Sequence, residues 1–119
     1  MAPGGSMKGV YLKFYVNESR KHHGMVIYEW LLETAKSLGV EGGSAFRAVA
    51  GFGRHRHMHE EHFFELASML PVEVAFLVTE EHAELLLDRI EQENLRLFYA
   101  RLPATFGLTC PESAERGVD

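Results

Sequence analysis

The sequence predicts an α+β sandwich of the βαββαβ type, in which an antiparallel four-stranded sheet is covered on one face by two helices. Four short segments rich in β-branched, aromatic and other apolar residues are typical of strands, and two segments repeat apolar residues at helical spacing. Two βαβ halves in this order fold most simply into such a sandwich. With 119 residues, of which 46% are hydrophobic, the chain is large enough for one domain with a substantial core.

The first half of the chain is expected to supply a strand, a helix and a second strand. Apolar residues alternate with other side chains over Val10–Val16, which predicts a strand, and the polar stretch Asn17–Gly24 is expected to be a loop. Over about Met25–Leu38 the apolar residues recur at helical spacing, and Gly39 suits the end of that helix. Ala45–Phe52 is expected to form the second strand.

The second half is expected to repeat the pattern after an ambiguous segment. Phe63–Leu70 fits either a helix or the returning arm of a hairpin. Val72–Val78 is an apolar run typical of a central strand. Thr79 is a suitable N-cap for a helix that should end near Glu93, and Leu95–Leu102 alternates as a last strand.

These elements set the expected domain boundaries. Residues 1–7 are expected to be a disordered leader or an expression remnant, residues 8–102 the folded domain, and residues 103–119 a loose tail. The sheet face without helices should carry apolar and aromatic residues. An uncovered apolar face of that size predicts a homo-oligomer.

Composition excludes several classes of function. A formal charge of −5 argues against general nucleic-acid binding, which requires clustered Lys and Arg. The single cysteine, Cys110, permits no intramolecular disulfide and no multi-cysteine zinc site, which favours a reducing compartment. No apolar run approaches the roughly 20 residues of a membrane span. We therefore expect a cytoplasmic protein.

The segment Gly51–His62 concentrates the groups that can bind a ligand. Its two arginines, Arg54 and Arg56, favour a phosphate or carboxylate, which the backbone N–H groups near Gly51 and Gly53 could approach closely. The same segment contains four histidines, which alternatively predict a zinc, nickel or copper site completed by Glu60 or Glu61. These histidines are His55, His57, His59 and His62.

The spacing of the histidines does not choose between these readings. In an extended chain, His55, His57 and His59 point to one side at intervals of about 7 Å. In a helix, His55, His59 and His62 share a face instead. A solvated polar loop without a specific ligand is the third alternative.

Other polar residues are weaker candidates. His22 and His23 flank the first predicted helix and could join a ligand site, although paired loop histidines are more often simply exposed. His82 is expected at the surface, and Arg47 either on an exposed strand face or in a cleft between subunits. The thiol of Cys110 lies far from any predicted base. Trp30 is expected to pack, either in the core or at a subunit contact.

Several motifs resemble a known family. They are the helix segment Tyr28–Leu32, the turn Gly39–Ser44, the strand end Phe46–Gly53, and the pairs Met58-His59 and Leu70-Pro71. Over Lys8 to about Ile90 the chain resembles the PII-like family of small ferredoxin-fold proteins, long classed as a domain of unknown function. The resemblance implies a homotrimer whose sheets line a central barrel, a mobile loop after the second strand, and clefts between subunits that hold a nucleotide or another small effector.

The resemblance also has limits and implies a kind of partner. PII signalling proteins carry a glycine-rich, lysine-containing phosphate loop between the second helix and the last strand, whereas this chain has only Glu91–Asn94 there. The tyrosine that some of them modify is absent from Gly53–His62. Some relatives are encoded near a fluoride-export channel, which implies a membrane transporter or channel as a regulated partner.

Two functions of different classes follow. The first is a non-enzymatic regulator that binds an adenine nucleotide or another anion between subunits and thereby changes its grip on a partner. Its expected ligand-binding residues are Arg47, Gly51, Gly53, Arg54, Arg56 and His59. The second is a transition-metal-binding protein or metal-dependent enzyme that uses the cluster His55–His62, where only Glu60 and Glu61 could act as acid or base.

Overall fold

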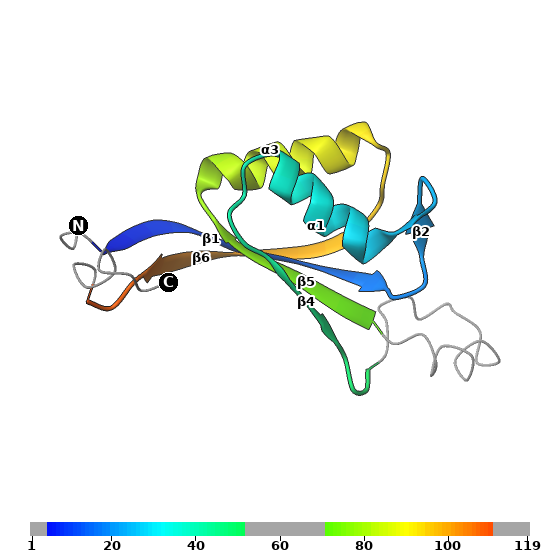
Figure 1. Cartoon of the computed structure of the whole chain (residues 1–119), viewed down its shortest axis with the longest axis horizontal. Coiled ribbons are helices and arrows are strands. Elements are labelled where there is room, and N and C mark those ends of the chain that lie inside the picture. Colours follow the sequence, from blue (N-terminus) through cyan, green and yellow to red (C-terminus); the bar gives the residue numbers. More distant parts are fainter. Residues whose placement is uncertain (1–4, 52–70, 111–119) are drawn as a thin grey trace.

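The computed structural model describes residues 5–51 and 71–110, and these form the predicted sandwich. The sheet consists of β1 (Ser6–Asn17), β4 (Ser44–Arg47), β5 (Pro71–Val78) and β6 (Phe98–Gly107) in the order β4-β5-β1-β6. All neighbouring strands are antiparallel. The helices α1 (Ile27–Ser37) and α3 (Glu80–Gln92) lie together on one face (Figure 1). The predicted α+β, ferredoxin-like fold is therefore confirmed.

The core lies between the sheet and the two helices. Alternate residues of β1 and β5 point toward the helices, and Phe14 meets Phe76 edge to face with ring centroids 6.3 Å apart. Each helix presents one apolar stripe to this layer. The buried apolar helix residues are Ile27, Leu31 and Ala35 of α1 and Ala83, Leu86 and Ile90 of α3. The alternation along β1 thus decides which side chains fill the core.

The ends of α3 follow the local signals in the sequence. The Thr79 hydroxyl accepts a hydrogen bond of 3.1 Å from the backbone N–H of His82, as expected of an N-cap. The helix gives way at Glu93 to Asn94, whose φ of 58° is left-handed. After α1, Gly39 has a φ of 96°, which glycine adopts without steric cost. Both helix ends therefore lie close to the predicted positions.

The strands differ from prediction at the ends of the domain. β1 begins at Ser6, inside the expected leader, and pairs from there with β6, which continues to Gly107 through the expected loose tail. β6 is an edge strand, where Pro103 is tolerated because its missing N–H removes no ladder bond. The tail boundary at residue 103 is therefore wrong, since backbone pairing extends five residues further.

Two predicted strands are cut short at one end. The last strand begins later than predicted, at Phe98, and the second strand ends earlier, at Arg47. Leu95 and Leu97 are not strand residues, because the Leu95 N–H bonds to the Ile90 carbonyl at the end of α3 and both leucines pack against the core. β4 ends at Arg47, after which only the Ala48 N–H bonds to the Pro71 carbonyl, at 2.9 Å. Phe63–Leu70 lies outside the described residues.

A small hairpin spans the end of the expected loop Asn17–Gly24 and the first two residues of the expected helix, which begins at Ile27 and not at Met25. β2 (Lys21–His22) pairs with β3 (Met25–Val26), and the turn residues His23 and Gly24 have φ values of 54° and 79°. Two residues with positive φ give the tight turn favoured between antiparallel strands. The hairpin leads directly into α1 and fixes where His22 and His23 lie.

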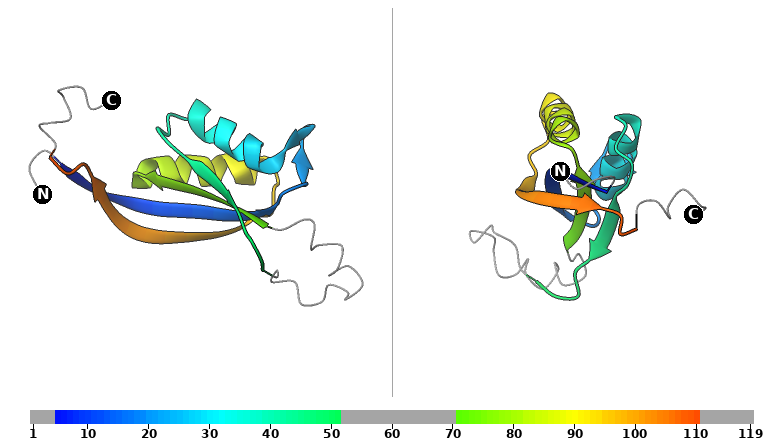
Figure 2. Two further views of the ribbon diagram at one scale, coloured as in Figure 1. Left: turned by 60° about the horizontal axis from the view of Figure 1, so that its bottom comes forward. Right: turned by 90° about the vertical axis from the view of Figure 1, so that its left-hand side faces the viewer.

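The other face of the sheet has no helix over it in the part of the chain that the structure describes (Figure 2). Residues that are directly opposite in the register share this face, such as Tyr11 with Leu77 and Leu102, and Tyr15 with Phe98. We call it the open face. Its large apolar and aromatic members are Tyr11, Tyr15, Phe46, Leu77, Phe98 and Leu102. The predicted uncovered apolar face is therefore present.

No helix in residues 5–51 and 71–110 is long and apolar enough to cross a membrane.

Candidate functional site

The structure brings the described residues on either side of residues 52–70 together at an edge of the sheet. Gly51 is the last described residue before it and Pro71 the first after it. The hydrogen bond from Ala48 to Pro71 joins them beside the edge strand β4. A Cβ atom on Gly51 would lie 3.9 Å from the Pro71 ring, which is an ordinary van der Waals distance. The described chain therefore stops before residues 52–70 and resumes after them at one place on the sheet.

Arg47 is the one predicted site residue near this point whose side chain is described. It closes β4, is largely exposed, and its Nε donates a hydrogen bond to a carboxylate oxygen of Glu18 at the end of β1. That bond, together with the charge of Glu18, raises the pKa of the guanidinium above its ordinary value. Arg47 is thus held at the edge of the sheet by a carboxylate.

The other predicted ligands lie outside the described residues. These are Gly53, Arg54, His55, Arg56, His57, His59 and His62, together with Glu60 and Glu61. The anion and metal hypotheses for this segment both stay predictions.

A second group of polar side chains gathers where the hairpin meets the end of α3. The Nε2 atoms of His22 and His23 lie 2.9 and 3.2 Å from the same carboxylate oxygen of Glu93. The hydrogen bond to His22, followed by that to His23, lowers the pKa of the Glu93 carboxyl, which is therefore ionised at neutral pH. The sequence names both histidines as weak candidates but gives no sign of Glu93, which lies 71 residues beyond His22.

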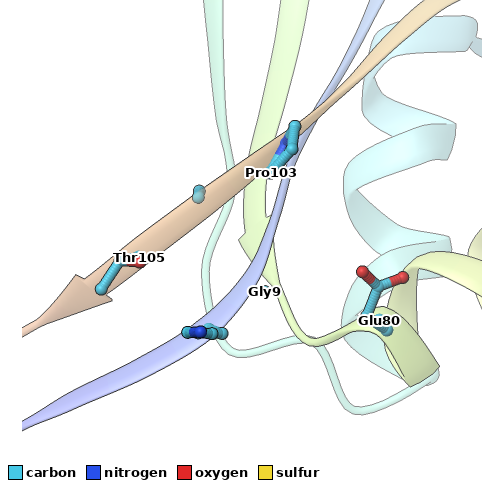
Figure 3. A pocket seen from close by; sticks show the side chains of 6 residues that line it. Gly9, Glu80, Pro103 and Thr105 are labelled. Atoms are coloured by element: carbon cyan, nitrogen blue, oxygen red, sulfur yellow. The ribbon is translucent and has the colours of Figure 1, made fainter. Parts of the chain in front are cut away.

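An open hollow of about 390 Å³ lies at the opposite end of the sheet. It is bounded by the extended ends of β1 and β6 and by the first residue of α3, Glu80, whose carboxylate stands off the helix start (Figure 3). That carboxylate pairs with Arg101 at 2.7 Å, and Lys8 also lines the hollow. The sequence gives no sign of this hollow because it depends on strand ends that lie beyond the predicted boundaries.

The remaining candidates are placed as follows. His82 is half-buried beside its N-cap, with Nδ1 3.2 Å from the Thr79 hydroxyl, so the expected surface position is only partly correct. Trp30 packs against the core and meets the His22 ring edge to face at 4.9 Å, which confirms the packing prediction. Cys110 is exposed and carries a free thiol.

Comparison with known proteins identifies relatives of the whole domain. The family described as DUF190, Uncharacterized ACR, COG1993, matches residues 9–95. The UPF0166 protein of Aquifex aeolicus (strain VF5) is 35% identical over 88 residues, which are 74% of this chain and 84% of that protein.

Solved structures share the fold at lower identity. CPII from Thiomonas intermedia K12, in a structure bound to ADP and bicarbonate, has a TM-score of 0.60 and 18% identity over 87% of this chain and 92% of that one. Its apo form, described as a nitrogen regulatory PII-like protein, has a TM-score of 0.59 and 15% identity over 87% and 97% of the two chains. The fold is that of PII-like proteins, and the family match shows that this chain belongs to the DUF190 family.

Proposed function

We propose that this chain is a non-enzymatic PII-like regulatory protein. It assembles as a homotrimer through the open face and binds a small anionic effector, an adenine nucleotide in the first place, in clefts between subunits. Two features support the proposal together: a PII-like fold, and a sheet face that is apolar and aromatic without a covering layer. The open face is the observation that carries it.

The composition of the open face favours association over solvation. The exposed side chains of Leu77 on β5 and Leu102 on β6 flank Tyr11 of β1. Phe46 of β4, also exposed, lies further along the same face, in register with Glu73 of β5. Contiguous apolar patches larger than a few hundred Å² are rare on monomers and mark interaction surfaces. A second and third copy of the same sheet would bury these side chains, as the implied central barrel requires.

The two charged residues within this face, Lys13 and Glu73, are of opposite sign and each contacts a tyrosine. The Lys13 ammonium lies 5.4 Å from the ring centre of Tyr11 and 5.7 Å from that of Tyr15, and the Tyr11 hydroxyl donates to Glu73 at 3.4 Å. The side-chain hydrogen bond to Tyr15, with a smaller contribution from the charge of Glu73, raises the pKa of Lys13. Covering the face would therefore not leave an isolated charge, which would otherwise oppose assembly strongly.

The effector site is proposed at the edge where β4 ends. An edge strand of one subunit is placed to face its neighbour, and the glycine- and arginine-rich segment leaves the sheet at this point. The proposed contacts are Arg47, Gly51, Gly53, Arg54, Arg56 and His59. Arginine side chains and closely approaching backbone N–H groups suit a phosphate or bicarbonate. The related CPII structures hold such anions, ADP and bicarbonate in one and AMP as well in another.

Regulation implies a partner, for which we propose a membrane transporter or channel reached from the cytoplasm. This part rests on the resemblance to the PII-like family. Cell fractionation with cross-linking to membrane proteins tests it, and recovery of the chain only in free trimers, with and without effector, would contradict it.

Ligand-dependent stability tests the effector. An effector that binds only the folded protein raises its melting temperature as its concentration exceeds Kd. We expect ADP, AMP or ATP, with or without bicarbonate, to raise Tm of the wild type, and the variant Arg54→Ala/Arg56→Ala to lose most of that rise. The variant Arg89→Ala/Arg96→Ala removes the same charge outside the proposed site and should keep it. Equal shifts in both variants, or none in the wild type, would contradict the proposal.

A further inference from the structure

We propose that His22, His23 and Glu93 form a binding site for a divalent transition metal ion, of which zinc is the representative. The site is separate from the histidines of the segment Gly51–His62 and does not depend on the proposed regulatory function. It joins the β2–β3 hairpin to the end of α3.

The possible ligand atoms of the three residues lie close together. One ligand atom from each of the three residues lies within 4.8 Å of the others, and both imidazole Nε2 atoms are within 3.2 Å of one Glu93 oxygen. In a tetrahedral zinc site with bonds of about 2.0–2.2 Å, ligand atoms lie roughly 3.3–3.5 Å apart. Coordination would therefore require the two Nε2–oxygen contacts to lengthen by a few tenths of an ångström and the widest donor separation, at most 4.8 Å, to close by up to about 1.4 Å. Each Nε2 that binds the metal would give up its proton, so that the remaining proton of the ring lies on Nδ1.

The backbone of the turn already holds the two imidazole rings together. His23 is in the left-handed region at φ 54° within the two-residue turn, and this places its ring 4.1 Å from that of His22, centre to centre. Positive φ is uncommon for non-glycine residues, although asparagine, aspartate and histidine adopt it more often than the others. A tight turn thus brings two neighbouring histidines to one point, although neighbours on a regular strand would point to opposite faces.

The side chain of His22 is held in place by packing. Its ring packs edge-on against Trp30 of α1, and its side chain is only 14% exposed. Glu93 comes from the other helix and is 30% exposed. The ligands are therefore anchored by separate elements whose positions the core fixes, which limits the reorganisation that binding requires.

Charge also favours a cation at this place. Glu93 is the C-cap of α3, at the helix end where the backbone carbonyls carry partial negative charge. Among the described residues, Glu93 has no Lys or Arg salt-bridge partner. Arg20, which directly precedes the hairpin, donates to the Arg96 carbonyl at 3.3 Å. The negative charge of the carboxylate is therefore available to a metal ion.

A hydrogen-bonded structural cluster would not need both histidines. His22 alone connects the hairpin to Glu93 with a 2.9 Å contact while packing on Trp30. His23 is 70% exposed, so it contributes little burial, and yet it directs a second Nε2 to the same oxygen. Two imidazoles and one carboxylate form a common ligand set for Zn²⁺ and similar ions, and they leave at least one coordination position open.

Metal titration of the untagged full chain tests the site. After treatment with a chelator, Zn²⁺ is titrated by calorimetry and Co²⁺ by absorption spectroscopy, which reports coordination geometry directly. The principal variant is His23→Ala, because its exposed side chain is least important for folding. The variant Glu93→Gln keeps the shape of the third ligand and removes its charge.

The matched control removes histidines elsewhere. The variant His55→Ala/His57→Ala/His59→Ala should keep the same high-affinity equivalent of metal as the wild type, whereas His23→Ala and Glu93→Gln should each weaken it at least tenfold and reduce the Co²⁺ absorption. Any histidine-rich chain can bind zinc weakly. The test is therefore the difference in metal affinity between the variants of the proposed site and the triple-histidine control. A change of less than threefold in His23→Ala, or no binding by the wild type at micromolar Zn²⁺, would overturn the proposal.

Discussion

The two faces of the sheet use similar side chains for different purposes. On β1, Leu12 and Phe14 point toward the helices and are at most 1% exposed, whereas Tyr11 and Tyr15 point to the open face and remain partly accessible. Both faces are apolar along the same strand, so composition alone does not distinguish them. The difference shows that one face stabilises the single chain and that the other is available for association.

The largest effect is expected on the covered face. Phe14→Ala removes a fully buried ring that contacts Phe76 and Tyr99, and it should lower the free energy of unfolding by about 3–5 kcal/mol. Chemical denaturation measures this loss. A loss below about 1 kcal/mol would mean that the core is not where the structure places it.

Substitution of Gly9, where β1 approaches β5 closely, should give the next largest loss of stability. At Gly9 an added Cβ would lie 2.2 Å from the backbone oxygen of Val78, which cannot move without shifting β5. We expect Gly9→Ala to destabilise the chain by about 1–3 kcal/mol, in the range of overpacked sites. Gly42→Ala meets no atom within 4 Å and is the control. Equal denaturation midpoints for the two variants would contradict the close approach of β1 to β5.

On the open face the effect should fall on assembly instead of folding. Leu77→Arg puts a charge into the patch and should reduce the mass in solution to the 13.5 kDa of one chain. Leu85→Arg changes a residue of similar exposure, 43% against 50%, on the outer side of α3 and should keep the oligomer. Light scattering compares the two variants. An oligomer that is unaffected by Leu77→Arg would separate the open face from assembly.

The pH dependence of stability that Glu93 causes should be a smaller effect. It concerns neither face of the sheet. Because its folded pKa lies below the unfolded value, its contribution to stability is present above the ordinary carboxyl pKa and is lost as the pH falls through the folded pKa. The stability difference between wild type and Glu93→Gln in metal-free buffer should therefore be present at neutral pH and shrink at acidic pH. A difference that grows on acidification has the opposite sign and would contradict the contact with His22.

The smallest effect is expected for the exposed ion pairs of Arg101. Its guanidinium donates to Glu80 and Glu84 at 2.7 and 2.8 Å, but both carboxylates are well exposed. Such pairs contribute about 0–1 kcal/mol. Arg101→Met should change the denaturation midpoint slightly, and less at high salt. A loss comparable to that of Phe14→Ala would show that β6 depends on these pairs.

Much of the fold could be predicted because its signals are local. The apolar stripes of both helices, the Thr79 cap and the alternation along β1 each lie within a few residues, and all agree with the structure. The continued pairing of β1 with β6 to Gly107 could not be predicted in this way. It depends on backbone hydrogen bonds between segments about 100 residues apart, and the side chains there carry no alternation.

The residues of the candidate sites could likewise be predicted only where the signal is local. Arg47 was predicted from its position in the second strand, but its partner Glu18 belongs to another element. His22 and His23 were noticed as a pair, whereas Glu93 looked like an ordinary residue at a helix end. Only the packing of the hairpin beside the C-terminus of α3 brings the three together. Contacts of this kind depend on topology, which periodicity does not encode.

The measurement that tests the central claim most directly is calorimetric titration of ADP, in bicarbonate buffer, into the wild type and into Leu77→Arg. If the effector lies between subunits, the oligomeric wild type binds ADP, and the monomeric variant, still folded by circular dichroism, loses at least tenfold in affinity. Equal affinity of the folded monomer for ADP would place the site within one chain and contradict the account.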